Sequence, residues 1–127
     1  MPLWPDAPYE YAAAAGDFVF AAGACPIDEE GRVASPGDLE AQTALCVGNL
    51  RAAFEQNGAS LGDIVKATIY VVGRERADLV LSWTVAEPHL HRAPTTLVGI
   101  SFLGYPDQLV EIEAIAIVPK SPAAKPS

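Results

Sequence analysis

The chain has 127 residues, half of them hydrophobic, and a formal net charge of −8 from 16 acidic and 8 basic side chains. This length and composition predict a single folded domain and exclude a disordered chain or a coiled coil. The negative charge disfavours nucleic acid as a partner. No apolar run reaches the ~18–20 residues of a membrane-spanning helix, and the N-terminus lacks a basic signal-peptide region, so we expect no membrane partner and a cytoplasmic location.

The two ends of the chain are predicted to be arms around one domain. Residues 1–7 are rich in proline, and residues 120–127 form a polar, proline-containing tail that cannot build a core. The folded domain is therefore expected over residues 8–119. Trp4 either packs onto the domain or a neighbouring molecule, or belongs to a loosely held arm.

The first half of the domain reads as two strands and a helix. Strands are predicted at Tyr9–Ala14 and Asp17–Cys25, separated by a glycine turn. Residues 35–38, Ser-Pro-Gly-Asp, supply a capping residue, a proline at a first helical position and an acid in the first turn, which indicates a helix start. Gly58 indicates the helix end. Apolar residues recur on one helix face at three- and four-residue spacings: Leu39, Cys46, Val47, Leu50, Ala53 and Phe54.

The second half reads as a strand, a helix and two strands. Ile64–Gly73 alternates, and its apolar face is predicted to hold Val65, Ala67, Ile69 and Val71. A helix from about Arg76 to Glu87, ended by Pro88, is expected to bury Leu79, Val80, Trp83 and Ala86. Strands follow at Thr95–Ser101 and Leu109–Val118. The order β-β-α-β-α-β-β favours an α+β domain with two helices on one face of a mixed sheet.

The last strand alternates between two different faces. Its even-numbered residues from Val110 to Val118 are apolar and are expected to face the helices. Its other face is both apolar and acidic: Leu109, Glu111, Glu113, Ile115 and Ile117. Since the chain offers no third layer to cover that face, we expect a closed homo-oligomer in which another subunit covers it.

Two glutamates on this face are candidates for chemistry. Glu111 and Glu113 are two residues apart on one strand, which places their Cβ atoms ~6.5–7 Å apart. A carboxylate that loses water at a subunit interface can act as general acid and base for an attacking water. The alternative is that both are interface carboxylates paired with Lys66, Arg92 or a cation of another subunit.

The remaining candidates are weaker. His89 and His91 form an H-x-H pair without a third ligand nearby, so a loop-packing role is favoured and no metal is expected. Cys25 has no adjacent histidine to activate it, and Cys25 and Cys46 are interpreted as two buried thiols. The GxSxG, P-loop, GxGxxG and HExxH signatures are absent. Water activation by a carboxylate and simple ligand binding remain, and neither requires a cofactor.

Five stretches together resemble the RidA/YjgF family, formerly labelled endoribonuclease L-PSP. They are Pro8-Tyr9, FVFAAGACPID (18–28), GDLEAQT (37–43), NGASLGDIVKATIYV (57–71) and LVEIEAIAI (109–117). The resemblance spans about residues 8–118. It implies a chorismate-mutase-like fold and a homotrimer whose sheets form a central barrel, with a small-molecule substrate bound in the clefts between subunits. The best-known members hydrolyse enamines and imines to ketoacids and ammonia without a cofactor.

The resemblance also implies roles for single residues. The water-activating glutamate of the family falls on Glu111, its cleft tyrosine on Tyr9 and its site-lining glycine on Gly23. The arginine that holds the substrate carboxylate in the deaminase branch falls on Thr95, and the cysteine two residues later falls on Leu97. A threonine cannot supply the charge and planar fork of a guanidinium.

Arg92 is a poor substitute for that arginine, because its position gives it the opposite strand parity to Thr95. The sequence therefore predicts a smaller, more neutral cleft and a substrate without a carboxylate. Two functions stay open: a RidA-like hydrolase, or a non-catalytic trimer that binds a small metabolite or a partner protein. RNA cleavage, which the older label suggests, is disfavoured by the charge of −8 and the lack of a basic aromatic strip.

Overall fold

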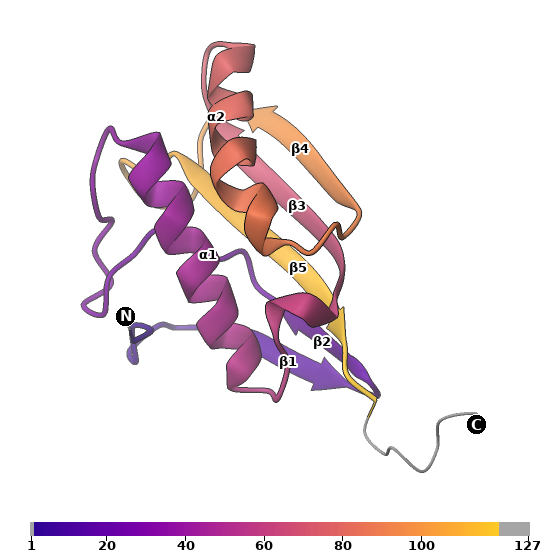
Figure 1. Ribbon diagram of the computed structural model, residues 1–127. Coiled ribbons are helices and arrows are strands. Elements are labelled where there is room, and N and C mark those ends of the chain that lie inside the picture. Colours follow the sequence, from indigo (N-terminus) through magenta and orange to yellow (C-terminus); the bar gives the residue numbers. More distant parts are fainter. Residues whose placement is uncertain (1, 120–127) are drawn as a thin grey trace.

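The computed structural model describes residues 2–119, and within them the helices and strands follow the predicted order (Figure 1). The predicted tail at 120–127 lies outside the described residues. Two short 3₁₀ turns, Leu61–Asp63 and Glu87–His89, flank the longer elements. The elements are β1 (Ala12–Ala15), β2 (Phe18–Ala21), α1 (Leu39–Glu55), β3 (Ile64–Val72), α2 (Arg76–Ala86), β4 (Thr95–Ile100) and β5 (Val110–Ile117).

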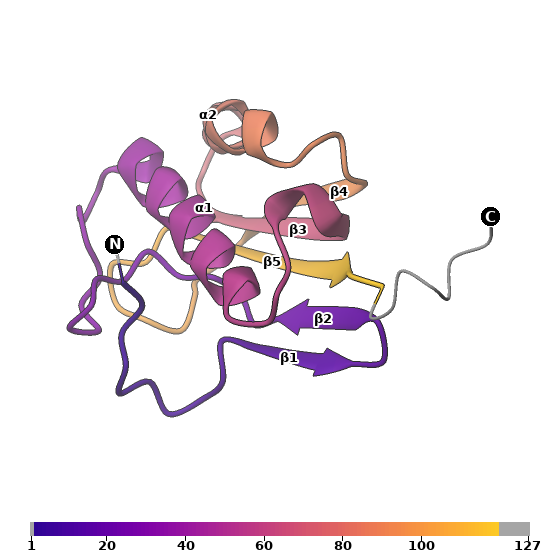
Figure 2. The ribbon, with the colours of Figure 1, turned by 60° about the horizontal axis from the view of Figure 1, so that its bottom comes forward.

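The strands form one mixed sheet in the order β1-β2-β5-β3-β4. β3 and β4 pair in parallel, and the other neighbours pair antiparallel. A parallel pair needs a crossover, and α2 supplies it between β3 and β4. Both helices lie on one side of the sheet, and no described element covers the other side (Figure 2). The predicted α+β architecture is confirmed; we call the uncovered side, which carries Glu111 and Glu113, the open face.

The core lies between the sheet and the helices. Every residue of the predicted apolar face of α1 is buried, including Leu50 and Phe54. β5 contributes Val110 and Ile112, both fully buried, while its odd-numbered residues are only half-buried. Fully burying a Leu, Ile, Val or Phe side chain stabilises the fold by about 1.5–3 kcal/mol, so this layer fixes which face of β5 the glutamates occupy.

The start of α1 differs from the prediction. Its N-cap is Asp38 rather than Ser35, and the Asp38 side chain accepts a hydrogen bond from the Ala41 backbone N–H at 2.9 Å. Ser35 and Gly37 have φ angles of +49° and +81°, so the residues before Asp38 form a turn and not the first helical turn. At the other end the prediction holds: Gly58 has φ +75°, and the Ala59 N–H donates to the Phe54 carbonyl.

Three further expectations are wrong in detail. The register shifts between Ile64 and Lys66, and this β-bulge leaves Val65 exposed instead of on the apolar face. In α2, Val80 is 60% exposed and Ser82 is buried in its place. The Ser82 hydroxyl lies 3.0 Å from the Thr43 hydroxyl, so a polar contact joins the two helices. The first two strands are shorter than expected, and beyond Ala21 only a single bridge continues β2 along β5.

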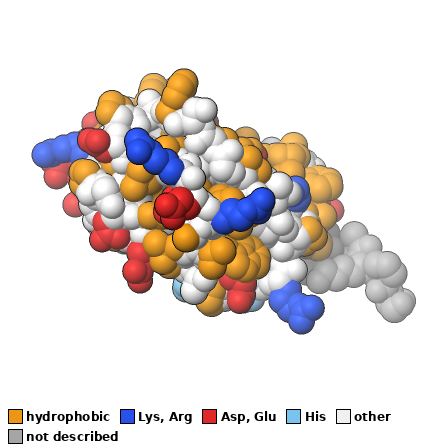
Figure 3. Space-filling model, turned by 90° about the horizontal axis from the view of Figure 1, so that it is seen from above, with side chains coloured by type: hydrophobic (Ala, Val, Ile, Leu, Met, Phe, Trp, Pro, Cys, Tyr) orange, Lys and Arg blue, Asp and Glu red, His pale blue; other side chains and the backbone are white. Residues whose placement is uncertain are grey.

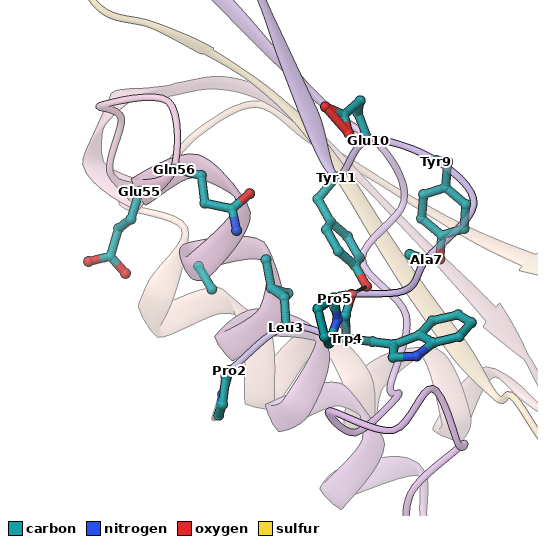
Figure 4. A pocket seen from close by; sticks show the side chains of 11 residues that line it. Pro2, Leu3, Trp4, Pro5, Ala7, Tyr9, Glu10, Tyr11, Glu55 and Gln56 are labelled. Atoms are coloured by element: carbon teal, nitrogen blue, oxygen red, sulfur yellow. Dashed lines mark hydrogen bonds between the residues drawn. The ribbon is translucent and has the colours of Figure 1, made fainter.

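The N-terminal arm packs on the domain. A Cβ on Gly31 would lie 2.5 Å from the Trp4 ring, so the indole rests directly on that glycine. The Tyr11 hydroxyl donates to the Trp4 carbonyl at 2.7 Å, and Pro2 and Leu3 lie beside α1 (Figure 4). A cavity of about 700 Å³ remains between the arm and the end of α1. Within residues 2–119 no helix is both long and apolar enough to cross a membrane.

Candidate active site

The Glu111 carboxylate is held on the open face by two donors. The Gln108 side-chain nitrogen donates to Glu111 Oε1 at 3.1 Å, and the Cys25 thiol donates to the same oxygen at 3.3 Å. Within the described part of the chain no group donates to Glu111 Oε2. One carboxylate oxygen is therefore fixed, and the other is free to accept a proton from a bound water.

Gly23 provides the space that this geometry needs. A Cβ at residue 23 would lie 2.0 Å from Glu111 Oε2 and 2.6 Å from Glu111 Cγ, closer than non-bonded atoms approach. The carboxylate thus lies directly against the Gly23 backbone. Gly23, which the family resemblance assigned to the site, therefore contacts Glu111.

Buried polar residues position both segments around Glu111. Gln108 is 4% exposed, and its side-chain oxygen accepts from the Tyr105 N–H while its nitrogen also donates to the Val110 carbonyl. Asn49 of α1 donates to the carbonyls of Cys25 and Ile27, at 2.8 and 3.0 Å. α1 therefore fixes the segment that carries Cys25, and the turn before β5 separately fixes Gln108.

The Cys25 thiol is a hydrogen-bond donor and not a nucleophile. Burial, the negative charge of Glu111 and the hydrogen bond to it raise the pKa of Cys25 to about 12. The thiolate is the reactive form of cysteine, and it is scarce at neutral pH when the pKa is so high. Both cysteines are free; Cys46 is buried, as expected, whereas Cys25 is only half-buried.

Tyrosines border the Glu111 site. The hydroxyls of Tyr9 and Tyr105 lie 3.0 Å apart, and the Tyr9 ring meets the Tyr11 ring edge-on at a centroid distance of 5.6 Å. Burial, the hydrogen bond with Tyr105 and the nearby Cys25 raise the pKa of Tyr9. Tyr9 therefore offers a neutral phenol beside Cys25.

Glu113 has a different environment from Glu111. The Tyr70 hydroxyl donates a short hydrogen bond to Glu113 Oε1, and this bond raises the pKa of Tyr70. Among the described residues neither glutamate forms an ion pair with a cation, so the predicted alternative of pairing with Lys66 or Arg92 is absent within one chain. The same strand thus carries one carboxylate held by a phenol and one with an unpaired oxygen.

Within one chain, Thr95 and Leu97 lie away from Glu111, and their place in a cleft between subunits stays a prediction. Thr95 pairs with Ala67 and Leu97 with Ile69, and both partners are buried against the helices. Since paired residues of neighbouring strands point to the same face, Thr95 and Leu97 lie on the side of the sheet opposite Glu111.

Thr96 occupies the open face instead. It pairs with Thr68, which in turn pairs with Glu113. Arg92 lies in a groove beside Trp83 and Glu87 on the helix side, with a φ of +63°, so it does not reach the open face. His89 and His91 are exposed, and within residues 2–119 no three side chains of the His, Cys, Asp or Glu type converge as metal ligands.

A two-helix layer on a five-stranded mixed sheet, with a glutamate lying on a glycine of the neighbouring strand end, defines the class of this protein. A family model described as endoribonuclease L-PSP matches residues 2–118, and the chain belongs to this family, the RidA/YjgF family. A RutC family protein from Pyrococcus abyssi is 35% identical over 113 residues, which cover 88% of this chain and 87% of that protein.

Two further relatives match over most of their length. The 3-aminoacrylate deaminase RutC from Acinetobacter baylyi is 31% identical over 115 residues, 90% of each chain. The crystal structure of a YjgF/YER057c/UK114 family member from Mycobacterium tuberculosis matches with a TM-score of 0.73 and 31% identity, covering 87% of this chain and 86% of that one.

Two residues around the site escaped the sequence analysis: Gln108 and Tyr105. Gln108 carries no sequence signal, because a glutamine in a turn is normally exposed. Strand parity places Thr96 on the open face only once the pairing of β3 with β4 is known, and that pairing is a property of the fold.

Proposed function

We propose that the protein hydrolyses small imines or enamines, with Glu111 as the acid-base residue that activates water. The observation that carries this proposal is the asymmetric carboxylate: Oε1 receives hydrogen bonds from Gln108 and Cys25, while Oε2 faces Gly23 without a donor. A relative carries the name 3-aminoacrylate deaminase, and 3-aminoacrylate is an enamine, so the same chemistry is supported by relationship.

The reaction needs only water and one carboxylate. The water oxygen attacks the carbon of the C=N bond, the π electrons move to nitrogen, and Glu111 transfers one water proton to that nitrogen. Glu111 then takes the proton of the new hydroxyl and delivers it to the amine, the C–N bond breaks and the C=O bond forms. Both water protons end on nitrogen, which leaves as ammonia. An enamine first tautomerises to the imine, as its carbon gains one proton and its nitrogen loses another.

We further propose that copies of the chain cover the open face as a homotrimer. Phe18 and Phe20 on β2 stack at 5.8 Å and are 43% and 44% exposed. Ile115 and Ile117 lie opposite them on β5. An apolar strip of this kind is typical of a subunit interface, and the trimer is the assembly that the family resemblance implies.

RNA cleavage is not part of this proposal. The older family label contains the word endoribonuclease, but the chain carries a net charge of −8. On the molecular face in Figure 3, blue and red side chains are scattered between hydrophobic ones without a concentrated basic patch. Binding to a phosphate backbone depends on clustered cations.

The test compares Glu111→Gln with Glu113→Gln, which makes the same change two residues away on the same strand face. Imines with and without a carboxylate are generated in situ, and ammonia release is measured above the spontaneous rate. We expect Glu111→Gln to lose about 10²–10⁴-fold in rate, the usual contribution of a general base, while Glu113→Gln keeps the wild-type rate. Equal activity of Glu111→Gln and wild type would refute the mechanism. Saturable binding without product would favour the non-catalytic metabolite-binding trimer.

A further inference from the structure

The cavity of about 700 Å³ between the N-terminal arm and the end of α1 has no role in the proposed hydrolysis. Glu55 and Gln56 at the end of α1 lie on one side of it, and residues 9–11 lie on the other (Figure 4). Of the residues that line it, only Tyr9 also borders the Glu111 site. We call this space the arm cavity.

The lining of the arm cavity is aromatic and acidic. Its rings and its carboxylates are those of Trp4, Tyr9, Tyr11, Glu10 and Glu55. Two prolines also line it, and none of its described lining residues is a lysine, arginine or histidine. Neither glutamate forms an ion pair within residues 2–119. Aromatic-lined grooves bind proline-rich segments in the polyproline II conformation, and unpaired carboxylates beside the rings favour a segment that carries lysine.

The chain itself contains a segment of this complementary composition. Residues 119–127 have the sequence PKSPAAKPS, with three prolines, two lysines and no acidic residue. Proline has no backbone N–H to donate to a β-ladder, and its fixed φ favours the polyproline II conformation. The segment therefore has the cations and the proline rings that the arm cavity lacks.

The end of the sheet places this segment within reach of the arm cavity. The Val118 N–H donates to the Asp17 carbonyl at 2.7 Å, so the chain leaves β5 beside the turn between β1 and β2. From Asp17 back to Tyr11 the distance along β1 is ~20 Å at ~3.3 Å per residue. Residues 119–127 span ~28 Å in the polyproline II conformation, at ~3.1 Å per residue. β1 consists of four alanines, so it presents no large side chain along this path.

We propose that residues 119–127 dock into the arm cavity of their own molecule. At the polyproline II rise, Lys125 lies ~22 Å beyond Val118, level with Tyr11 and its neighbour Glu10. Lys125 therefore pairs with Glu10, and the flanking prolines pack on the aromatic rings. A weak contact is sufficient, because a tethered segment binds at an effective concentration in the millimolar range. The docked segment fills the space between the arm and α1, and this inference is independent of the hydrolase function.

The experiment measures this proximity in the full chain. Ser127→Cys is labelled with a nitroxide at neutral pH, where the other two cysteines react poorly: Cys46 is buried, and the pKa of Cys25 is about 12. A nitroxide broadens the NMR signals of nearby protons. We expect it to broaden the indole N–H signal of Trp4 strongly and that of Trp83, which lies in a groove at the end of α2, only weakly.

Charge reversal tests the proposed pair. Glu10→Lys is expected to reduce the broadening of Trp4 roughly 3- to 10-fold, since it replaces an attraction to Lys125 by a repulsion. Lys125→Glu alone should give the same loss without touching the folded domain, and the two changes together should restore the broadening. Glu40→Lys makes the matched change in the first turn of α1, at the opposite end of the helix from the cavity, and should leave the broadening unchanged.

Three outcomes would overturn the proposal. The first is equal broadening of Trp4 and Trp83, and the second is broadening of Trp4 that Glu10→Lys and Lys125→Glu both leave intact. The third concerns the source of the segment. Copies isotopically labelled for NMR are refolded together with nitroxide-labelled copies that are invisible in the spectrum. Broadening of Trp4 in this mixture, as strong as in the singly prepared protein, would place the segment in another molecule; its absence supports docking within one chain.

Discussion

Replacing Gly23 by alanine tests whether the position of the Glu111 carboxylate controls the reaction. The added methyl would lie 2.0 Å from Oε2, 2.4 Å from Cδ and 2.6 Å from Cγ of Glu111. A contact as deep in the side chain as Cγ cannot be relieved by turning the carboxylate alone. The whole side chain must rotate away from Gln108 and Cys25.

The expected cost falls on both catalysis and folding. A hydrogen bond to a charged group contributes about 1.5–3 kcal/mol, and losing the Gln108 alignment at the reacting carboxylate lowers kcat by roughly 10- to 150-fold. Gly23 does not adopt a positive φ, so alanine causes no backbone strain. We expect the thermal midpoint to fall, because the lost hydrogen bonds outweigh the stabilisation of about 0.4–1 kcal/mol gained when alanine restricts the unfolded chain.

Gly48→Ala is the matched control for this substitution. Gly48 lies inside α1, and a Cβ there would have no atom within 4 Å. The same methyl is therefore expected to leave imine hydrolysis unchanged and to stabilise the helix by about 0.5–1 kcal/mol. Rates of ammonia release and thermal unfolding followed by circular dichroism provide both readouts. A Gly23→Ala protein with the wild-type kcat would refute the reasoning that ties activity to the Glu111 position.

Three further predictions concern the thiol, the interface and a buried amide. The charge of Glu111 helps to raise the pKa of Cys25 to about 12, so Glu111→Gln should lower that pKa and speed alkylation by iodoacetamide at pH 9; equal rates would contradict the contact. Phe18→Lys on the open face should shift the protein toward monomer in light scattering, whereas Val80→Lys on the outer face of α2 should not. Gln42→Leu removes three hydrogen bonds to loop backbone and should lower the free energy of unfolding by about 2–4 kcal/mol in urea titration, a loss that a value below 1 would contradict.

Periodicity was sufficient to predict the layers of this fold. The alternation in β5 separates Val110 and Ile112 from Glu111 and Glu113, and burial follows it residue by residue. The prediction failed where a β-bulge interrupts the alternation of faces: the bulge at Val65 turns that side chain outward. Pattern alone also could not choose between Ser35 and Asp38 as the cap, because the backbone of the preceding turn decides it.

The site was only partly accessible from the sequence. The pairing of Gly23 with Glu111 came from the family resemblance, and the structure brings the two residues into contact. The role of Thr95 stays a prediction: within one chain it lies on the face opposite Glu111, and the resemblance places the cleft between subunits. Lys66 was considered only as a counterion for a glutamate, because its contact with Thr96 depends on the register of β3 and β4.

The most direct test of the account is the rate of imine hydrolysis by Glu111→Gln, since Glu111 is the residue proposed to activate water. Glu111→Gln, the matched Glu113→Gln variant and wild type are compared by ammonia release above the spontaneous rate, with folding verified by circular dichroism. We expect Glu111→Gln to lose about 10²–10⁴-fold in rate and Glu113→Gln to keep the wild-type rate. A folded Glu111→Gln protein with the wild-type rate would contradict the account.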